Sequence, residues 1–462
     1  MNIMNNNKQK NWRDESRKAK HWHLDGAKVN CDLCPRHCSM KENQKGFCLV
    51  RGRVGDELHT FNYGVSVQAT IENIETEAVN HYRPGARILS MGNIGCMMAC
   101  SYCQNWQTSQ VKHLNDKNVH YYSPEDVIQL AIENEIEIIS WTYNDPVVWQ
   151  EFVVDTSRLA KQHGIKTLYK SALYIEEAPL KELIEVIDIF SVSLKGMKEE
   201  MYRKYTKGSL GPVLDSIKQI AQSDRHLEIS QLIVTEMNDN GEDAIRTADW
   251  ILKNVGEDTP LHLVAYHPAF RYTKKRTSIE TLLKLRKIVL DRGLNYCYLG
   301  NVYAEEVSNT ICKKCSSTLV KRFGLTVDVV GVNEHNSCKN CGSPVIITEA
   351  LKGQSSPLDI DNFIKRQDHK HNWDGEINSL HIVLGDSHAE TILKIEHLPE
   401  GRTEFVQVSG DLERLIISKR SVHESAVRIS ANVDGPLSYL PVLDRAHFPV
   451  EELSKSSHKY LN

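Results

Sequence analysis

The chain has 462 residues, of which 40% are apolar and 25% charged, and this length suggests about three domains of an ordinary globular protein. With 56 basic and 60 acidic residues, the formal net charge is −4. This balance excludes the basic field typical of nucleic-acid-binding proteins. No stretch of about 18 uncharged apolar residues is present, which excludes a membrane-spanning helix.

The N-terminal stretch contains basic residues but lacks the apolar segment of a secretory signal. We therefore expect residues 1–26 to be a disordered polar leader and the protein to be cytoplasmic. Except for Cys297, which we expect in the core, the cysteines fall into three short groups. These are Cys31, Cys34, Cys38 and Cys48; Cys96, Cys100 and Cys103; and Cys312, Cys315, Cys338 and Cys341. Such groups in a chain without an export signal predict metal sites in a reducing compartment.

Short apolar runs predict seven strands. They cover residues 86–92, 136–143, 165–172, 186–194, 226–234, 261–267 and 294–300. Helices are predicted over residues 124–134, 147–163 and 210–222. Ser123 followed by Pro124 is a favourable helix start, and Gly164 is a stop. Thr277 and Glu280 have the spacing of a capping box for one more helix.

Alternation of strands and helices predicts parallel βα units. We expect an α/β fold with a closed or partial (β/α) barrel rather than an open doubly wound sheet, although the pattern alone does not decide. In a barrel the functional site lies at the carboxyl ends of the strands. The second cysteine group follows the first predicted strand, and polar residues follow several of the others, so we expect the site there.

The remaining segments suggest further parts of the chain. We expect an N-terminal cysteine-rich segment over 27–84, the barrel over 85–302 and a four-cysteine ribbon-like segment over 303–350. A polar linker over 351–378 would lead to a β-rich module over 379–462, where short apolar runs alternate with turn residues. We expect this module to hold a partner or substrate and to supply no cofactor ligands.

The spacing Cys96-x3-Cys100-x2-Cys103 places three thiolates on one short loop, where they can hold three irons of a [4Fe-4S] cluster. The fourth iron then remains open to a ligand with an amine and a carboxylate, such as S-adenosylmethionine. One electron passed to its sulfonium would give a 5′-deoxyadenosyl radical that abstracts hydrogen. The alternative is zinc, or a cluster completed by a distant cysteine.

This motif, with Tyr102 before the last cysteine, resembles the radical S-adenosylmethionine (SAM) superfamily. The segment GCMMACSYCQNWQTSQ is similar to its activating-enzyme-like branch. Four further segments resemble the radical enzymes of the AmmeMemoRadiSam system, namely CDLCPRHC with KGFCLVR, TYNDP, SLKG and CKKC with CKNC. The resemblance covers residues 27–345.

The resemblance implies roles for individual side chains. Cys96, Cys100 and Cys103 would bind the cluster. Tyr102 would contact adenine, and Asn144, Asp145, Lys195 and His267 would contact SAM. Each has a plainer alternative: loop packing for Tyr102, a helix N-cap for Asp145, a surface charge for Lys195 and a structural histidine for His267.

The chain also departs from the pattern of that family. Asp145 stands where the family has Glu, and Ser193 stands where it has Asp. Lys170, Ser171 and Ala172 replace Thr-Asn-Gly. These departures leave the cluster ligands intact but change the expected surroundings of substrate and cofactor.

Two cysteine groups flank the barrel. Cys312, Cys315, Cys338 and Cys341 have the spacing of a four-thiolate site, which predicts structural zinc or a single iron. For Cys31, Cys34, Cys38 and Cys48, zinc, an auxiliary iron–sulfur cluster and merely buried thiols all remain open.

We therefore expect a radical SAM enzyme that abstracts hydrogen, with a protein partner as the first candidate substrate. The resemblance implies a Memo-like or glycyl-radical-type partner and a low-potential electron donor such as flavodoxin or ferredoxin, with no role for nucleic acid or membranes. The alternatives are radical modification of a small molecule or peptide, and a non-catalytic protein that binds iron–sulfur or zinc.

Overall fold

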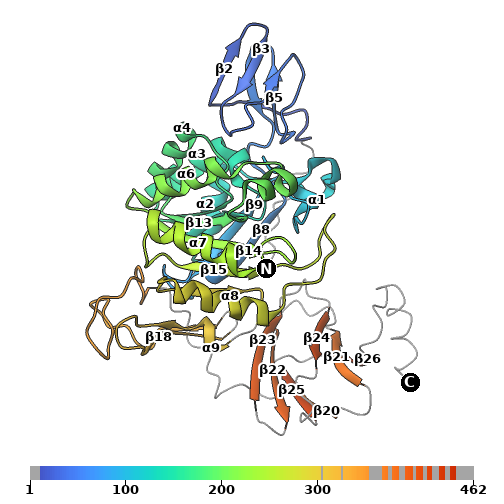
Figure 1. Ribbon diagram of the computed structural model, residues 1–462. Helices are drawn as coiled ribbons and strands as arrows, with labels where there is room; N and C mark the ends of the chain where they lie inside the picture. The colour runs from blue at the N-terminus through green and yellow to red at the C-terminus, as the bar shows by residue number, and fades with distance from the viewer. Residues whose placement is uncertain are drawn as a thin grey trace. The chain divides into compact units, whose positions relative to one another are not determined.

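Figure 1 shows the computed structural model of the chain. The structure describes residues 11–302, 305–323 and 326–352, and the backbone of the strands between 367 and 443. The chain divides into two compact units. One consists of Asn2–Arg322 and Val327–Ser356, and the other contains Pro357–Asn462.

An eight-stranded sheet forms the centre of the first unit, in the order β16-β15-β14-β13-β12-β11-β9-β8. Its parallel strands are β9 (Arg87–Gly92), β11 (Ile138–Thr142), β12 (Lys166–Ser171), β13 (Ile189–Leu194), β14 (His226–Ile233), β15 (Leu261–Ala265) and β16 (Cys297–Gly300). They confirm the positions of the predicted strands and the α/β class. The edge strand β8 (Gln68–Asn73) is antiparallel to β9 and was not predicted, because its sequence is mostly polar. Among the described strands, no pairing joins β8 to β16, so barrel closure is not observed.

Helices lie between consecutive parallel strands in the chain (Figure 1). They are α2 (Pro124–Glu133), α3 (Gln150–Gln162), α4 (Glu177–Val186), α6 (Leu210–Ala221), α7 (Gly241–Asn254) and α8 (Ile279–Asp291). The predicted start of α2 is confirmed, since the Ser123 side chain accepts a hydrogen bond from the backbone N–H of Asp126. None of the described helices has both the length and the apolar character needed to cross a bilayer.

The predicted cap of α8 is wrong by one residue. Ser278 is the N-cap, and its hydroxyl accepts a hydrogen bond of 3.2 Å from the N–H of Thr281. The Thr277 hydroxyl instead donates to the carbonyl of Ile233 at the end of β14. Thr277 therefore fixes the loop before α8 to the sheet rather than capping the helix.

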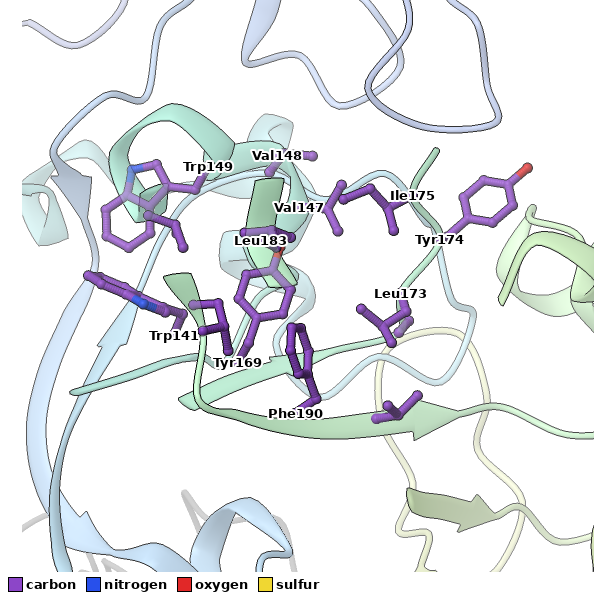
Figure 2. Close-up of a cluster of buried hydrophobic side chains, with 14 of the residues drawn as sticks. Trp141, Val147, Val148, Trp149, Tyr169, Leu173, Tyr174, Ile175, Leu183 and Phe190 are labelled. Carbon is purple, nitrogen blue, oxygen red and sulfur yellow. The ribbon is translucent and has the colours of Figure 1, made fainter. Parts of the chain in front are cut away.

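Large side chains of the central strands pack against the helices (Figure 2). Trp141 of β11, Tyr169 of β12 and Phe190 of β13 are fully buried there, together with Trp149 and Leu183. Successive side chains of a strand point to opposite faces. The residues adjacent to these in the strands, Ser140, Lys170 and Ser191, therefore face the other side of the sheet, which is polar.

A charged pair occupies this polar face. Lys170 Nζ donates to Glu77 O at 3.0 Å, Ser191 Oγ at 3.0 Å and Ser230 Oγ at 2.9 Å. The Glu77 carboxylate, at the end of η1 (Ile74–Glu77), accepts a 2.8 Å hydrogen bond from Thr142 Oγ1. Burial lowers the pKa of Lys170 to about 8. The two opposite charges compensate each other inside the protein.

A second buried carboxylate, Glu228 of β14, has four partners. It accepts hydrogen bonds from His226 Nε2 at 2.9 Å and His262 Nε2 at 2.7 Å. The backbone N–H groups of Asn80 and His81 donate to it at 2.9 and 2.7 Å. Burial acts to raise its pKa, but the bonds from the two histidines hold the pKa of Glu228 well below its usual range.

The same network reaches the ribbon, which contains β17 (Thr310–Ile311), β18 (Thr318–Phe323) and β19 (Thr326–Asp328). Arg322 of β18 donates to Asn80 O and to Thr310 Oγ1, both at 2.7 Å. Tyr298 OH lies 2.8 Å from Thr310 Oγ1 and 2.6 Å from His81 Nε2. The ribbon is thus fixed to the amino-terminal side of the sheet by buried polar bonds.

The N-terminal segment forms two small sheets, β1-β6-β5 and β2-β3-β4. Their strands are β1 (Arg17–Lys18), β2 (Trp22–Asp25), β3 (Lys28–Cys31), β4 (Ser39–Met40), β5 (Arg51–Val54) and β6 (Glu57–Thr60). This differs from the expected disordered leader over 1–26, because β1 and β2 lie within that range and Trp12 is only 3% exposed. Trp12 Nε1 donates to Asp116 Oδ1 at 2.9 Å, which anchors the segment. Residues 1–10 lie outside the described residues.

A buried ion pair fixes this segment to α3. Arg51 Nη1 lies 2.8 Å and 3.0 Å from the two carboxylate oxygens of Glu151. The backbone of Lys20 completes the network, with its N–H 2.8 Å from Glu151 Oε1 and its carbonyl 2.7 Å from Arg51 Nη2. Removing one member of such a pair would leave a buried charge without its partner.

The second unit contains two antiparallel sheets, β20-β25-β22-β23 and β24-β21-β26. Their strands are β20 (Gln367–Asn372), β21 (Ile377–Val383), β22 (Thr391–Leu398), β23 (Arg402–Val408), β24 (Arg414–Ser418), β25 (Ala426–Ala431) and β26 (Ser438–Leu443). β20 lies inside the segment predicted as a linker. The rest of that linker falls mostly on 353–366 and 373–376, which are outside the described residues, as are residues 444–462. The other predicted domain boundaries stay predictions.

His81 provides a test of the buried network. Burial lowers the pKa of His81 to about 3, below the ordinary value of 6.5. The unfolded chain therefore binds this proton more readily, so stability is present above pH 6.5 and is lost as the pH falls toward 3. As the pH falls from about 7 to about 5, we expect His81 to lower the unfolding free energy of the wild type by about 2 kcal/mol. Urea denaturation at the two pH values measures this change.

The variant His81→Gln should lose this part of the pH dependence. His335→Gln is the matched control, because the His335 side chain is 81% exposed and should leave the slope unchanged. An identical slope in His81→Gln and the wild type would contradict the assignment.

Candidate functional site

The second cysteine group lies on a loop, residues 93–105, that follows the carboxyl end of β9. The loop backbone is held from two sides. Ala99 N–H donates to Thr206 O at 2.9 Å, and Ser101 N–H donates to Tyr205 O at 2.8 Å, both in η5 (Tyr202–Thr206). From the other side, Arg271 N–H donates to Ser101 O at 2.9 Å. These bonds fix the loop at the carboxyl ends of the parallel strands, where the sequence predicts the site.

The structure brings Cys96, Cys100 and Cys103 near one another. Burial raises the pKa of all three thiols, that of Cys100 to about 12. The charges of Cys100 and Cys103 further raise the pKa of Cys96, and the charge of Cys103 raises that of Cys100. Cys96 Sγ accepts a hydrogen bond of 3.3 Å from Met98 N–H, and Ser109 Oγ lies 3.7 Å from Cys103 Sγ. Thiolates are the metal-binding form, so a bound cluster would have to displace these protons.

Asp145 connects the ends of two strands. Its carboxylate caps η4 (Pro146–Trp149) by accepting a 3.2 Å bond from Val147 N–H. It also accepts bonds of 2.8 Å from Ser171 Oγ and from Ala172 N–H, both at the end of β12. The carboxylate therefore already has three protein partners, an arrangement that matches the N-cap alternative.

Asn144 is likewise bonded within the protein. Its Nδ2 donates to Asn93 O at 2.7 Å, and its Oδ1 accepts from Thr108 Oγ1 at 2.8 Å. Since Asn93 and Thr108 flank the cysteines in sequence, Asn144 ties the cysteine loop to the end of β11.

Lys195 places a positive charge beside the thiols. It follows β13, is half-buried, and its charge acts to lower the pKa of Cys100 and of Cys103 against the larger effect of burial. Within the described part of the chain, the Lys195 ammonium has no hydrogen-bond partner. It is thus available to an anionic ligand at this loop.

The two remaining predicted residues are His267, in the segment after β15, and Tyr102, within the cysteine loop itself. His267 is exposed, and its Nδ1 lies 3.0 Å from Gln104 Nε2. Burial and Arg276 lower the pKa of His267. Tyr102 is 3% exposed and packs with Met201 and Tyr266, as the packing alternative predicts.

The sequence analysis predicts Tyr102 in the site but misses Asn93, Ser101 and Gln104. Asn93 Oδ1, Ser101 Oγ and Tyr102 OH are buried oxygens without a hydrogen-bond partner among the described residues. Buried polar atoms normally have partners, so these three fit a ligand bound at the loop. The signal for Asn93 is its place directly after a predicted strand. Gln104 and Lys170 depend on contacts that no local pattern indicates.

The third cysteine group has the geometry of a single-ion site. The sulfurs of Cys312 and Cys341 are 3.7 Å apart, as are those of Cys315 and Cys338. All four sulfurs lie within 4.8 Å of one another. A tetrahedral ion with metal–sulfur bonds of about 2.3 Å separates its thiolates by about 3.8 Å. The group can therefore hold one metal ion, whose identity the spacing does not determine.

Comparison with known proteins agrees with the position of the cysteine loop, residues 93–105. A family model for the Radical SAM superfamily matches residues 93–251, which include the three cysteines, Asn144, Asp145 and Lys195. An uncharacterized protein of Methanocaldococcus jannaschii is 34% identical over 326 residues, which cover 70% of this chain and 97% of that protein.

Two activating enzymes are also similar. The pyruvate formate-lyase 1-activating enzyme of Escherichia coli is 25% identical over 187 residues, or 40% of this chain and 75% of that enzyme. The (2S)-3-sulfopropanediol dehydratase activating enzyme of Klebsiella oxytoca is 26% identical over 112 residues, or 24% of this chain and 35% of that enzyme.

The four-cysteine group yields a direct test. Changing Cys312, Cys315, Cys338 and Cys341 to Ser should remove about one metal ion per chain, detected by elemental analysis. It should also make this region sensitive to limited proteolysis, because metal binding contributes folding free energy. Cys297→Ser is the control, since Cys297 lies in β16 outside the group and should keep the metal. Unchanged metal content in the fourfold variant would contradict the site.

Proposed function

The chain belongs to the radical SAM superfamily and is homologous to pyruvate formate-lyase-activating enzymes, and we propose that it is an activating-enzyme-like member with Cys96, Cys100 and Cys103 as cluster ligands. The superfamily implies a [4Fe-4S] cluster and SAM. When bound, they supply reductive cleavage of the sulfonium and a 5′-deoxyadenosyl radical for hydrogen abstraction. The observation that carries this proposal is the set of three half-buried thiols beside the Lys195 ammonium, which has no hydrogen-bond partner among the described residues.

The chain's own groups would bind and orient the cofactor. Lys195 would pair with the carboxylate of SAM, because its ammonium has no hydrogen-bond partner among the described residues. Asn93 Oδ1 and Ser101 Oγ, which lack partners in the described structure, could bond polar groups of the same ligand. Asn144 and Asp145 would hold the loop and the strand ends in place, rather than contact SAM as the resemblance suggests.

We propose a protein as the substrate. Two relatives are named as activating enzymes of a pyruvate formate-lyase and a sulfopropanediol dehydratase, which are themselves enzymes. Together with the resemblance to the AmmeMemoRadiSam system, this favours a Memo-like or glycyl-radical-type partner and a flavodoxin or ferredoxin as donor in the cytoplasm. The C-terminal strands would hold that partner, and the four-cysteine ribbon would hold zinc.

The cluster ligands are tested by replacing Cys96, Cys100 and Cys103 with Ala. The reconstituted variant should form no 5′-deoxyadenosine when incubated with SAM and dithionite, because the electron path to SAM is lost. Chromatography of the quenched reaction measures the product. Cys297→Ala, in the core, should retain cleavage. Wild-type yields from the triple variant would overturn the proposed function.

Lys195 is tested separately. Loss of a charge-assisted contact costs about 1.5–3 kcal/mol, so Lys195→Met should raise the KM for SAM by about 10- to 100-fold. The variant Lys284→Met serves as the control, since Lys284 is exposed on α8 and does not line the pocket at Cys96. A KM within twofold of the wild-type value would show that Lys195 is only a surface charge.

A further inference from the structure

The N-terminal cysteines come together around one turn. Cys31 N–H donates to Cys38 O at 3.0 Å, which pairs the two ends of the first three cysteines. Phe47 N–H lies 3.3 Å from Cys38 Sγ and donates to it. A side chain at Gly46 would meet Cys38 Cβ and Sγ at 3.2 Å, so the absence of a side chain lets this segment approach Cys38. Cys48 follows immediately.

The four thiols also lie within electrostatic range of one another. The charges of Cys31, Cys38 and Cys48 all act on the Cys34 thiol. Cys31 and Cys34 are buried, and Cys38 and Cys48 are half-buried. Four cysteines gathered around one turn agree better with a shared metal centre than with independent core residues.

A single ion and a cluster require different separations between their thiolates. Within the described residues, only the ribbon cysteines form a group of three or more ligands that all lie within 4.8 Å of one another. The N-terminal cysteines and the group at Cys96 both fail that limit. A single tetrahedral ion needs thiolates about 3.8 Å apart, whereas a cluster gives each thiolate its own iron and so separates them further.

The two wider groups are neighbours. Cys48 and Cys96 line the same pocket. Gly95 has φ +85, and a side chain there would meet Cys48 O at 3.0 Å. Arg36, between Cys34 and Cys38, donates to the carbonyl of Met97. The backbone of one cysteine group therefore packs directly on the backbone of the other.

We propose that Cys31, Cys34, Cys38 and Cys48 bind a second [4Fe-4S] cluster, which passes single electrons to the cluster at Cys96, Cys100 and Cys103. The binding part rests on the geometry above, and the relay part rests on the proposed function. Four thiolates leave no iron open to SAM, so this cluster serves electron transfer only. A low-potential flavoprotein donor loses one electron, which reduces the N-terminal cluster. The N-terminal cluster then passes this electron to the cluster at Cys96, Cys100 and Cys103 and returns to its oxidised state. No proton moves.

The binding part is tested in the full-length variant with Cys96, Cys100 and Cys103 changed to Ala. After anaerobic reconstitution with iron and sulfide it should still hold about four irons per chain. After dithionite reduction it should show a cluster EPR signal that SAM does not change. Absence of iron, or zinc in place of iron beyond the ribbon's single ion, would overturn the proposal. Because this readout needs no SAM cleavage, failure of the proposed function would be seen separately.

The relay part is tested by electron transfer. In Cys38→Ser, reduction of the Cys96 cluster by reduced flavodoxin, followed by freeze-quench EPR, should slow by at least about tenfold, while Cys297→Ser keeps the wild-type rate. Equal rates in the two variants would overturn the relay. If Cys38→Ser does not fold, the test uses the wild-type protein with both clusters reduced. Spin coupling between neighbouring clusters should broaden the EPR signal, and an unbroadened signal would overturn the proposal that the two clusters are neighbours.

Discussion

Two carboxylates buried beneath the site determine how the first unit is assembled. Glu77 and Glu228 lie on the polar face of the sheet, where an unpaired charge would cost several kcal/mol. The Lys170 charge acts on the first carboxylate, which also accepts a hydrogen bond from Thr142 Oγ1. Two histidines and two backbone N–H groups satisfy the second. Because these partners come from several strands and from the loop before β9, the sheet forms its interior only when all of them are in place.

The charged and polar groups of the site above this layer are not all paired within the protein. Below, each charge has a partner within the protein; at the cysteine loop, Lys195 and the buried oxygens of Asn93 and Ser101 lack one among the described residues. A protein tolerates such unsatisfied groups where a ligand completes them. Asp145 differs from both sets of groups. Its carboxylate has three hydrogen-bond partners that join β11 to β12. It therefore holds the unpaired groups in place while being bonded within the protein itself.

Much of the fold can be predicted from sequence because each parallel strand is a short apolar run bounded by turn residues. The edge strand β8 was not predicted, since its polar side chains are partly exposed and form no apolar run. Within the site, cysteine spacing located the three groups but could not separate a single ion from a cluster, because sulfur–sulfur distances depend on the turn between them. The role of Lys170 was equally hidden: its partners Ser191 and Ser230 are 21 and 60 residues away.

Arg322 has a consequence for the order in which the chain acquires its structure during synthesis. Its bond to Asn80 O spans 242 residues, and contacts of such long range form late. The loop of Asn80 and His81 therefore emerges from the ribosome long before its last partner exists. Until the ribbon is made, the amino-terminal side of the sheet stays unsealed, so a nascent chain that stops short of the ribbon would expose those backbone groups to chaperones and proteases.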